Sequence, residues 1–471
     1  MLAIVVSRAD EASVNIGEQL LDIAEWTETA DGSRPDADGG GTVYRTEGAE
    51  IREFEGRHLE LERVADAFDN AGVADAFESP DTESGGSPSA PKLLLFASKH
   101  AGETDELLTA HPTGNFGEAE YGGESGQFAR AAPNAHRAVV HALAEHAPEG
   151  YDVGMECTHH GPTDVGVPSM FVEVGSAEPQ WRDPAAARAV AQAILDCRGV
   201  AADTPAEDGR RRQLVGFGGG HYVPRFERVV RETDWAVGHV GADWCLDALD
   251  EWAEDESEYE AVVERAFAES GAEYALVTGD RPDLVATVES LGYRVVDERF
   301  LRETTGVPLD FVDAVEAAVA PVDEGLRFGE SATEAVCEWR VVSLPDDLLA
   351  EATGIDAEAV RSWFEGSALA FGTEQRGTVV TGPAVLDETR ERAAVIDALA
   401  DVLAGRYDSV ERDGDELRAR ERRFDPDLAE TLGIPEGPKY GRLSAGQSVE
   451  VDGREIEPET VHSERVRRFT L

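Results

Sequence analysis

Short apolar runs alternate with amphipathic stretches along the first 300 residues of the chain. The apolar runs have the length of strands and lie at residues 2–7, 93–97, 153–157, 169–174, 213–217, 236–240, 274–278 and 293–297. The amphipathic stretches have a helical period and lie at residues 133–146, 184–197, 224–233 and 258–270. Buried strands that alternate with helices predict an α/β domain over residues 1–304, in which helices flank a mostly parallel sheet.

The pattern changes after residue 305. Helical periodicity at residues 345–364 and 387–403 predicts a mainly helical region over residues 305–432. The last stretch, residues 433–471, is predicted to be a small β unit. The sequence therefore predicts an appended α+β region behind the larger domain.

Loops account for the segments that lack periodicity. Residues 78–91 and 201–211 are rich in Ser, Gly, Pro and Asp, a composition that cannot build a core, so both are predicted to be insertions. The apolar run at residues 2–7 is too short for a signal sequence or a membrane span. We expect it to be a buried first strand, and we expect no membrane partner.

The charge of the chain is strongly negative, with 96 acidic against 42 basic residues and a formal net charge of −54. Lysine is nearly absent, and acidic residues occur in every segment. This composition is typical of proteins that stay hydrated in molar salt, where the Debye length is about 3 Å. An RNA partner is therefore allowed, but its recognition needs short-range contacts. By itself the acidity identifies no substrate.

The four cysteines are widely spaced and form no C-x-x-C pair. A disulfide framework is therefore not expected, and a reducing cytoplasm is the natural compartment.

Histidines follow several of the predicted strands. His100, the pair His159 and His160, and His221 each come shortly after an apolar run. Because the carboxyl ends of parallel strands meet at one edge of a sheet, we expect these side chains to share a site there. A catalytic zinc ion takes three protein ligands and leaves one position to water. The candidate ligands are His100, Glu156, Cys157, His159, His160, Asp164, Glu173 and His221.

Adjacent histidines cannot both point the same way in an extended loop. One of His159 and His160 is therefore expected to hold metal while the other faces substrate. The remaining histidines have simpler interpretations. A hydrogen-bonded structural role is favoured for His111 and His239, and a solvated helix surface for His136, His141 and His146.

Three further features are candidate substrate contacts. The run Gly218-Gly219-Gly220 could present bare N–H groups to an anion, although glycine runs are also plain turns. Lys99, next to Ser98, is one of only three lysines, which suggests a need for a compact ammonium or a chance retention. Phe116 lies in a turn-rich stretch, where it could stack on an RNA base or anchor the loop in the core.

Several of these motifs, taken together, resemble a known family. Ser98-Lys99-His100, the stretch HPTGNFG at residues 111–117, ECTHHGPTDVGVPSMFVEVGS at 156–176 and GFGGGHYVPRF at 216–226 occur in the order found in archaeal and plant-type D-aminoacyl-tRNA deacylases. The resemblance covers about residues 1–300. It implies hydrolysis of the ester that joins a D-amino acid to the 3′ end of tRNA, on a fold related in outline to peptidyl-tRNA hydrolase and nucleoside phosphorylase.

The resemblance also implies a cofactor and a set of site residues. It implies zinc, with two ions per chain, and tRNA as the partner. We also expect a cytoplasmic monomer from a halophilic archaeon, with no DNA partner. The metal ligands are expected to be His100, Glu156 and His221. The expected catalytic residues are Lys99, His159, His160 and Glu173, and the expected substrate contacts are Ser98, Gly218, Gly219, Gly220 and Phe116.

The C-terminal region has a resemblance of its own. Residues 433–443 and the following VEVDGREIEPETV are similar to a segment of the tRNA 3′-processing endonuclease family. The catalytic HxHxDH motif of that family is absent, so no nuclease activity is implied. The region is expected either to help hold tRNA or to stabilise the chain.

Two other functions fit the same residues. One is a non-catalytic tRNA-binding protein with a structural zinc, in which protein ligands fill all four positions. The other is a different zinc hydrolase, such as an amidase, or a phosphorylase on the same scaffold.

Overall fold

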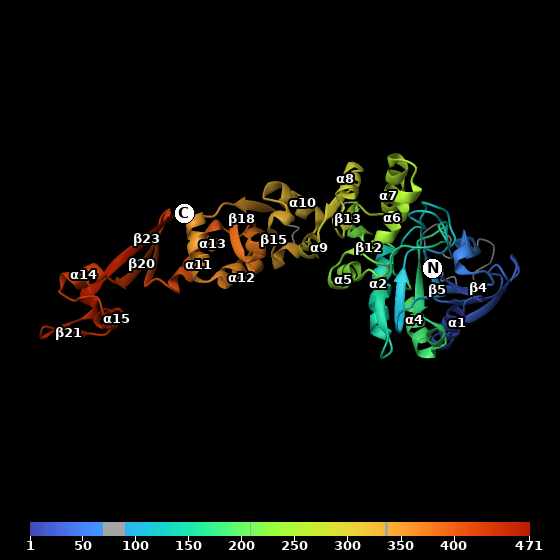
Figure 1. Ribbon diagram of the computed structural model, residues 1–471, viewed down its shortest axis with the longest axis horizontal. Coiled ribbons are helices and arrows are strands. Elements are labelled where there is room, and N and C mark those ends of the chain that lie inside the picture. The colour runs from blue at the N-terminus through green and yellow to red at the C-terminus, as the bar shows by residue number, and fades with distance from the viewer. Residues whose placement is uncertain (69–89, 208, 335–337) are drawn as a thin grey trace. The chain divides into compact units, whose positions relative to one another are not determined.

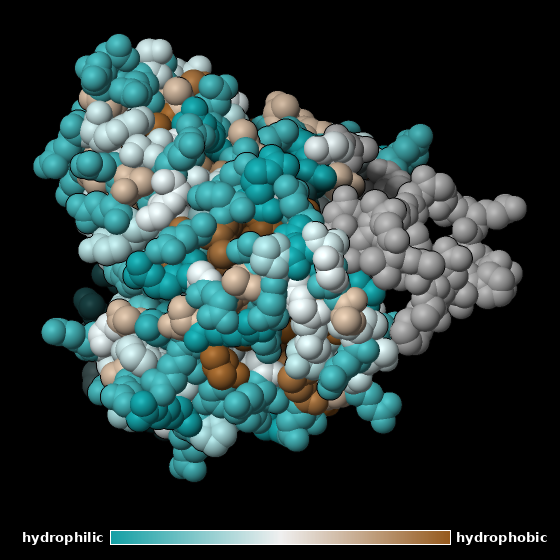
Figure 2. Space-filling model, turned by 90° about the vertical axis from the view of Figure 1, so that its right-hand side faces the viewer, coloured by the Kyte–Doolittle hydropathy of each residue, from teal (hydrophilic) through white to brown (hydrophobic). Residues whose placement is uncertain are grey.

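The computed structural model describes residues 1–68, 90–207, 209–334 and 338–471. Contacts divide the chain into two compact units, Met1–Thr305 and Gly306–Leu471. Hydrophilic side chains cover most of the face in Figure 2, and apolar ones form small separate patches. Among the described residues, no helix combines the length and apolar character that crossing a bilayer needs.

The first unit contains an eight-stranded mixed sheet with the order β2-β3-β4-β1-β5-β8-β6-β7. Its strands are β1 (Leu2–Ser7), β2 (Thr27–Asp31), β3 (Gly41–Thr46), β4 (Ala49–Phe54), β5 (Leu93–Lys99), β6 (Leu107–His111), β7 (Asp152–Met155) and β8 (Ser169–Gly175). The central strands β4, β1, β5 and β8 run parallel, and β6 runs antiparallel to β8. The predicted N-terminal strand is therefore at the centre of a sheet.

A second, fully parallel sheet of four strands belongs to the same unit, with the order β12-β11-β13-β14. Its strands are β11 (Gln213–Phe217), β12 (Ala236–Gly241), β13 (Tyr274–Val277) and β14 (Arg294–Val296). The predicted α/β class is confirmed. The expectation of one common sheet is wrong, because β7 and β11 belong to different sheets.

Helices cover these sheets (Figure 1). α1 (Glu11–Ile23), α2 (Pro133–His146) and α4 (Pro184–Asp196) pack their apolar faces on β1, β5 and β8 in one continuous core. α2 also contacts β12, so it touches both sheets. The other helices of the unit are α3 (Glu178–Trp181), α5 (Pro224–Glu232), α6 (Asp243–Trp252), α7 (Glu256–Ser270), α8 (Pro282–Ser290) and α9 (Glu298–Glu303).

The predicted insertions have different outcomes. Residues 201–211 contain a short hairpin of β9 (Ala206–Glu207) and β10 (Arg210–Arg211). Most of the segment at 78–91 lies outside the described residues.

The second unit mixes helices with antiparallel sheets. Its helices are α10 (Leu309–Ala318), α11 (Asp346–Ile355), α12 (Ala357–Ser367), α13 (Arg392–Ala404), α14 (Pro426–Thr431) and α15 (Pro438–Ser444). Its strands are β15 (Leu326–Phe328), β16 (Trp339–Val342), β17 (Ala370–Glu374), β18 (Val379–Asp387), β19 (Ser409–Asp413), β20 (Glu416–Phe424), β21 (Val449–Val451), β22 (Arg454–Ile456) and β23 (His462–Thr470). These strands form the sheets β15-β17-β18-β16, β19-β20-β23 and β21-β22.

This arrangement differs from the predicted division at residue 432. Residues 305–432 combine helices with strands, and β20 pairs with β23 across the expected boundary. The sequence of β20, ELRARERRF, carries charges on both faces and lacks the apolar run by which strands were recognised. Strong antiparallel pairing decides its structure instead.

Candidate metal centre

Loops from both sheets of the first unit meet at one point. β5, β6 and β7 of the eight-stranded sheet run into His100, His111 and the segment from Glu156 onward, respectively, and the loop after β11 brings in His221. An isolated bridge pairs Glu156 with Tyr222, and the amide of Cys157 donates to the carbonyl of His221 at 2.9 Å. The candidate site therefore lies where the two sheets are joined, rather than on the rim of one.

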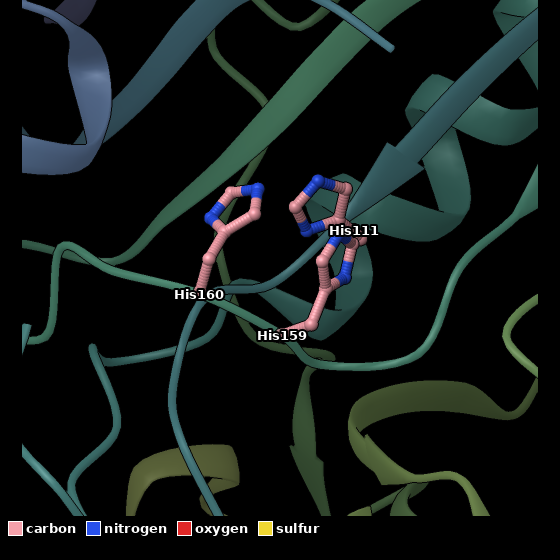
Figure 3. Close-up of side chains that lie close together, drawn as sticks. All are labelled: His111, His159 and His160. Atoms are coloured by element: carbon pink, nitrogen blue, oxygen red, sulfur yellow. The ribbon is translucent and has the colours of Figure 1, made fainter. Parts of the chain in front are cut away.

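Three histidines at this junction, His111, His159 and His160, lie close together (Figure 3). The Nδ1 atoms of His111, His159 and His160 lie 3.1, 2.9 and 2.8 Å from the backbone carbonyls of Pro112, Cys157 and Gly161. When Nδ1 donates to a carbonyl, the neutral imidazole presents its lone pair at Nε2. One ligand atom of each ring lies within 4.8 Å of the others, so the three can surround one ion.

Contrary to expectation, His159 and His160 both face this cluster. Their ring centroids are 4.4 Å apart. The backbone of His160 has φ +49°, so the loop is not extended there and consecutive side chains need not point in opposite directions. A left-handed histidine at a functional loop is the kind of local strain that tertiary contacts maintain.

A second triad adjoins the first. His100, Glu156 and His221 place one ligand atom each within 4.8 Å of the others, as predicted for a metal site. His221 Nε2 lies 2.8 Å from one oxygen of Glu156, and His100 Nδ1 lies 3.2 Å from the other. The Tyr222 hydroxyl, 2.7 Å from His100 Nε2, fixes the other edge of that ring. The structure thus brings the three predicted ligands together.

Glu173 connects the two triads. One of its oxygens lies 3.7 Å from His100 Nδ1 and 3.8 Å from His111 Nε2. It sits on β8, opposite Thr109 of β6 in the sheet register, and is buried. A buried carboxylate between two histidines can take up or release a proton within the cluster.

The buried groups of this cluster shift the pKa values of its histidines in both directions. Burial lowers the pKa of His100, but the adjacent carboxylates of Glu156 and Glu173 outweigh that effect and raise the pKa to about 11. Contacts with Cys157 and Glu156 raise the pKa of His221 to about 9. Burial and the neighbouring His111 lower the pKa of His160 to about 4. The cluster therefore contains neutral and cationic imidazoles around two carboxylates.

Two buried polar atoms of the cluster have no hydrogen-bond partner among the described residues. They are Nε2 of His111 and Oε1 of Glu156. An unsatisfied buried acceptor costs about 1–3 kcal/mol, which a coordinated cation would offset. The orphaned atoms and the imidazole–carboxylate donor set both fit zinc.

His111 is the member that sequence reasoning missed. It ends β6, is fully buried, and contacts His159 and Glu173. Leu107-Leu108-Thr109-Ala110 is a short apolar run before a histidine, the same signal that singled out His100. Recognising that run as a strand would have moved His111 from a structural role to the site.

Two other predicted residues lie differently from expectation. Lys99 Nζ lies 4.8 Å from the centre of the Trp181 ring, rather than against the ligand atoms, because alternation along β5 separates its direction from that of His100. Ser98 is buried and donates to Asp10 at 3.4 Å. These contacts do not support the predicted catalytic role of Lys99 or the predicted substrate contact of Ser98.

The glycine run forms a turn that returns the chain to Glu156. Gly218 and Gly219 both have positive φ, and a Cβ on Gly218 would meet the carbonyl of Thr278 at 2.4 Å. The amide of Gly218 donates to Gly241, so it is not a bare donor, while Gly220 is exposed beside His221. The turn positions His221; of the three predicted contacts, Gly219 and Gly220 lie toward solvent.

Phe116 is only 2% exposed and packs against Phe128. Its buried ring cannot stack on RNA, so the proposed substrate contact is wrong and the core-anchor alternative holds. Asp164 lies outside the cluster in an exposed pair with Arg63.

Histidines outside the cluster divide by burial. His239 is buried and hydrogen-bonded to Ala129, in agreement with a structural role. His136 was expected at the surface but is buried, with Nε2 3.0 Å from the carbonyl of Ala110. His141 is exposed as expected.

Comparisons with known proteins bear on this site. Residues 87–296 match a family model described as D-aminoacyl-tRNA deacylase. D-aminoacyl-tRNA deacylases of Haloarcula marismortui and Halorubrum lacusprofundi are 60% and 53% identical to this chain. Each match covers 100% of this chain, and the two matches cover 100% and 97% of the respective relatives. A crystal structure of a conserved protein of unknown function matches with TM-score 0.52 and 26% identity, covering 65% of this chain and 98% of that one.

Proposed function

The chain belongs to the family of D-aminoacyl-tRNA deacylases, and from this premise we propose that its buried histidine–carboxylate cluster binds zinc and performs the reaction. The activity is hydrolysis of the ester between a D-amino acid and the 3′ end of tRNA, which releases free D-amino acid and tRNA. It removes D-residues before they reach the ribosome.

One observation carries the proposed zinc site. Each of His111, His159 and His160 has Nδ1 against a backbone carbonyl, and one ligand nitrogen of each ring lies within 4.8 Å of the others. Metal-ligating histidines almost always donate their other N–H in this way, because the hydrogen bond fixes the tautomer and the ring. His100, Glu156 and His221 supply the ligands for a second ion, so we propose two ions per chain.

Zinc, when bound, lowers the pKa of water and polarises a carbonyl oxygen. The chain's own residues then orient the ester and move a proton. Glu173, within 4 Å of a ligand nitrogen of each triad, is placed to accept the proton of the attacking water. That proton is returned to the ribose oxygen when the ester bond breaks, which leaves the carboxylate ready for the next cycle.

The decisive experiment is a deacylation time course on matched D- and L-aminoacyl-tRNA in molar salt. We expect a chelator to stop hydrolysis of the D-ester and zinc to restore it. His160→Ala should lose both bound zinc and activity, whereas His141→Ala, an exposed histidine outside the cluster, should lose neither. Full activity in metal-free protein would refute the proposal. A structural zinc would instead leave His160→Ala poorly folded, which an unfolding curve detects.

The second unit is proposed to help hold tRNA. Residues 405–471 carry 12 of the 42 basic residues of the chain, and β20 and β23 bear several arginines on adjacent strands. We further propose that the chain acts as a monomer in the cytoplasm, where aminoacyl-tRNA is used. Light scattering in molar salt tests the oligomeric state.

A further inference from the structure

Two exposed aromatic side chains come from segments that adjoin the proposed metal centre. Trp244 is 48% exposed and Tyr121 is 65% exposed, and every other aromatic side chain of the described residues is buried or half-buried. They belong to different segments: Trp244 to the first turn of α6, and Tyr121 to the loop between β6 and α2. An exposed aromatic ring has no role in the core, so its position at a site suggests a ligand.

Trp244 stands beside the open side of the cluster. The side chain of His221 is 34% exposed, whereas that of Glu156 is fully buried, so solvent reaches the cluster at His221. The rings of His221 and Trp244 are nearly parallel, with an interplanar angle of 21° and centroids 6.5 Å apart. The amide of Asp243 donates to the carbonyl of Gly219 at 2.8 Å, which ties the start of α6 to the glycine turn.

The backbone of Tyr121 adjoins the loop that carries the other histidines. Its carbonyl accepts a hydrogen bond from Gly161, the residue after His160, at 2.9 Å. The next turn is held by the side-chain amide of Asn115, which donates to the carbonyls of Gly122 and Glu124. A Cβ on Gly161 would lie 2.4 Å from the backbone of Gly122, so the two loops are in close contact. The exposed ring therefore projects from an anchored loop.

Stacking suits the conditions under which this acidic chain works. Attraction between arginine and phosphate is screened in molar salt, and affinity based on it falls steeply. Stacking of a base on an aromatic ring needs no net charge and tolerates any sequence. The 3′ end of tRNA is single-stranded, so its bases are free to stack.

We propose that Trp244 stacks on the terminal adenine of tRNA and Tyr121 on the preceding base. This places the ester of the terminal ribose next to His221, at the mouth of the cluster. The inference rests on the proposed function, because it assumes that the ester reaches this cluster.

Binding is measured with a deacylated tRNA acceptor stem that carries 2-aminopurine at its last position, whose fluorescence is quenched by stacking. The quenching should be lost in Trp244→Ala and kept in Trp244→Phe. The same probe at the preceding position should respond to Tyr121→Ala but not to Tyr121→Phe. Val14→Ala, which shortens an exposed apolar side chain on α1, is the control.

Kinetics supply the second measurement. Each alanine variant should raise KM for D-aminoacyl-tRNA about 5- to 150-fold, the factor equivalent to about 1–3 kcal/mol per stacked base, with kcat nearly unchanged. Zinc content and the unfolding midpoint should stay at wild-type values. Quenching and KM unchanged in Trp244→Ala would overturn the proposal. A KM effect of Tyr121→Ala that depends on the attached amino acid would show that this ring contacts the side chain instead.

Failure of the stacking proposal is distinguishable from failure of the proposed chemistry. Glu156→Gln should abolish turnover and leave quenching intact, since stacking on Trp244 and Tyr121 does not involve that carboxylate. Turnover that survives Glu156→Gln would count against the metal centre and leave the stacking result unaffected.

Discussion

The two units of the chain handle ionisable groups in opposite ways. The first unit buries five histidines (His58, His100, His111, His136 and His239) and two interacting carboxylates, and it holds His159, His160 and His221 half-buried. The second unit contains the single histidine His462. In the second unit the charges lie mostly on exposed strands, in pairs such as Arg420 with Glu464 and Arg418 with Glu416.

We attribute the buried ionisable groups of the first unit to chemistry and the exposed charges of the second unit to solubility. Exposed ion pairs contribute about 0–1 kcal/mol, so the pairs on β20 and β23 add little to the stability of the second unit. Buried ionisable groups cost stability, and a cluster of them with shifted pKa values is a candidate functional site. Among the described residues, every group of potential metal ligands lies in the first unit.

A buried carboxylate in the first unit should matter most for activity. Glu156→Gln removes one charge and one proposed ligand from the cluster, so deacylation should fall by about a thousandfold or more, as expected when a transition-state contact is lost. Single-turnover hydrolysis of D-aminoacyl-tRNA measures the effect. A fall of less than tenfold would show that Glu156 serves packing only.

Acid should destabilise the first unit selectively. Burial lowers the pKa of His136 to about 4 and that of His239 to about 3, from 6.5 in the unfolded chain. The unfolded state therefore binds more protons below pH 6.5, and stability that is present above pH 6.5 is lost as the pH falls toward 4, by roughly 3 kcal/mol per histidine.

Hydrogen exchange followed peptide by peptide separates the two units in this experiment. His136→Asn should flatten the pH dependence of the first unit. An equal loss of stability in acid by the second unit would contradict the predicted difference between the two units.

Glu351, a buried carboxylate of the second unit, should affect the stability of the chain instead of its activity. Glu351 is buried, accepts from the Tyr407 hydroxyl at 2.7 Å and pairs with Arg406 and Arg467. Glu351→Gln weakens these charged hydrogen bonds and should cost about 1–3 kcal/mol of unfolding free energy. Deacylation under folding conditions should stay within twofold of wild type, so a large loss would mean that the second unit takes part in the chemistry.

Removal of the second unit should have the smallest effect on chemistry. The solved relative aligns over 98% of its length with 65% of this chain, a share close to that of Met1–Thr305, so a protein of this size folds alone. The fragment Met1–Thr305 should hydrolyse the ester at a kcat near that of the full chain, with KM for tRNA raised about tenfold or less. Unchanged KM would leave the second unit with a stabilising role only.

Much of the first unit follows from local pattern. The strand Gln213–Phe217 and the helix Pro133–His146 match the predicted ranges, and the spacing of residues from strand ends placed His100, Glu156 and His221 together. Hydrophobic periodicity is a local property, so a single segment reveals it. The composition, which does not depend on the fold, likewise indicated an adaptation to high salt.

Tertiary structure alone decided the site itself. It joined two sheets through the bridge between Glu156 and Tyr222, turned His160 into the cluster with a left-handed backbone, and added His111. It also buried Phe116 and exposed Tyr121 within one loop. Each of these outcomes depends on which distant carbonyl or side chain a group meets, and contacts between residues far apart in sequence leave no trace in the periodicity of either segment.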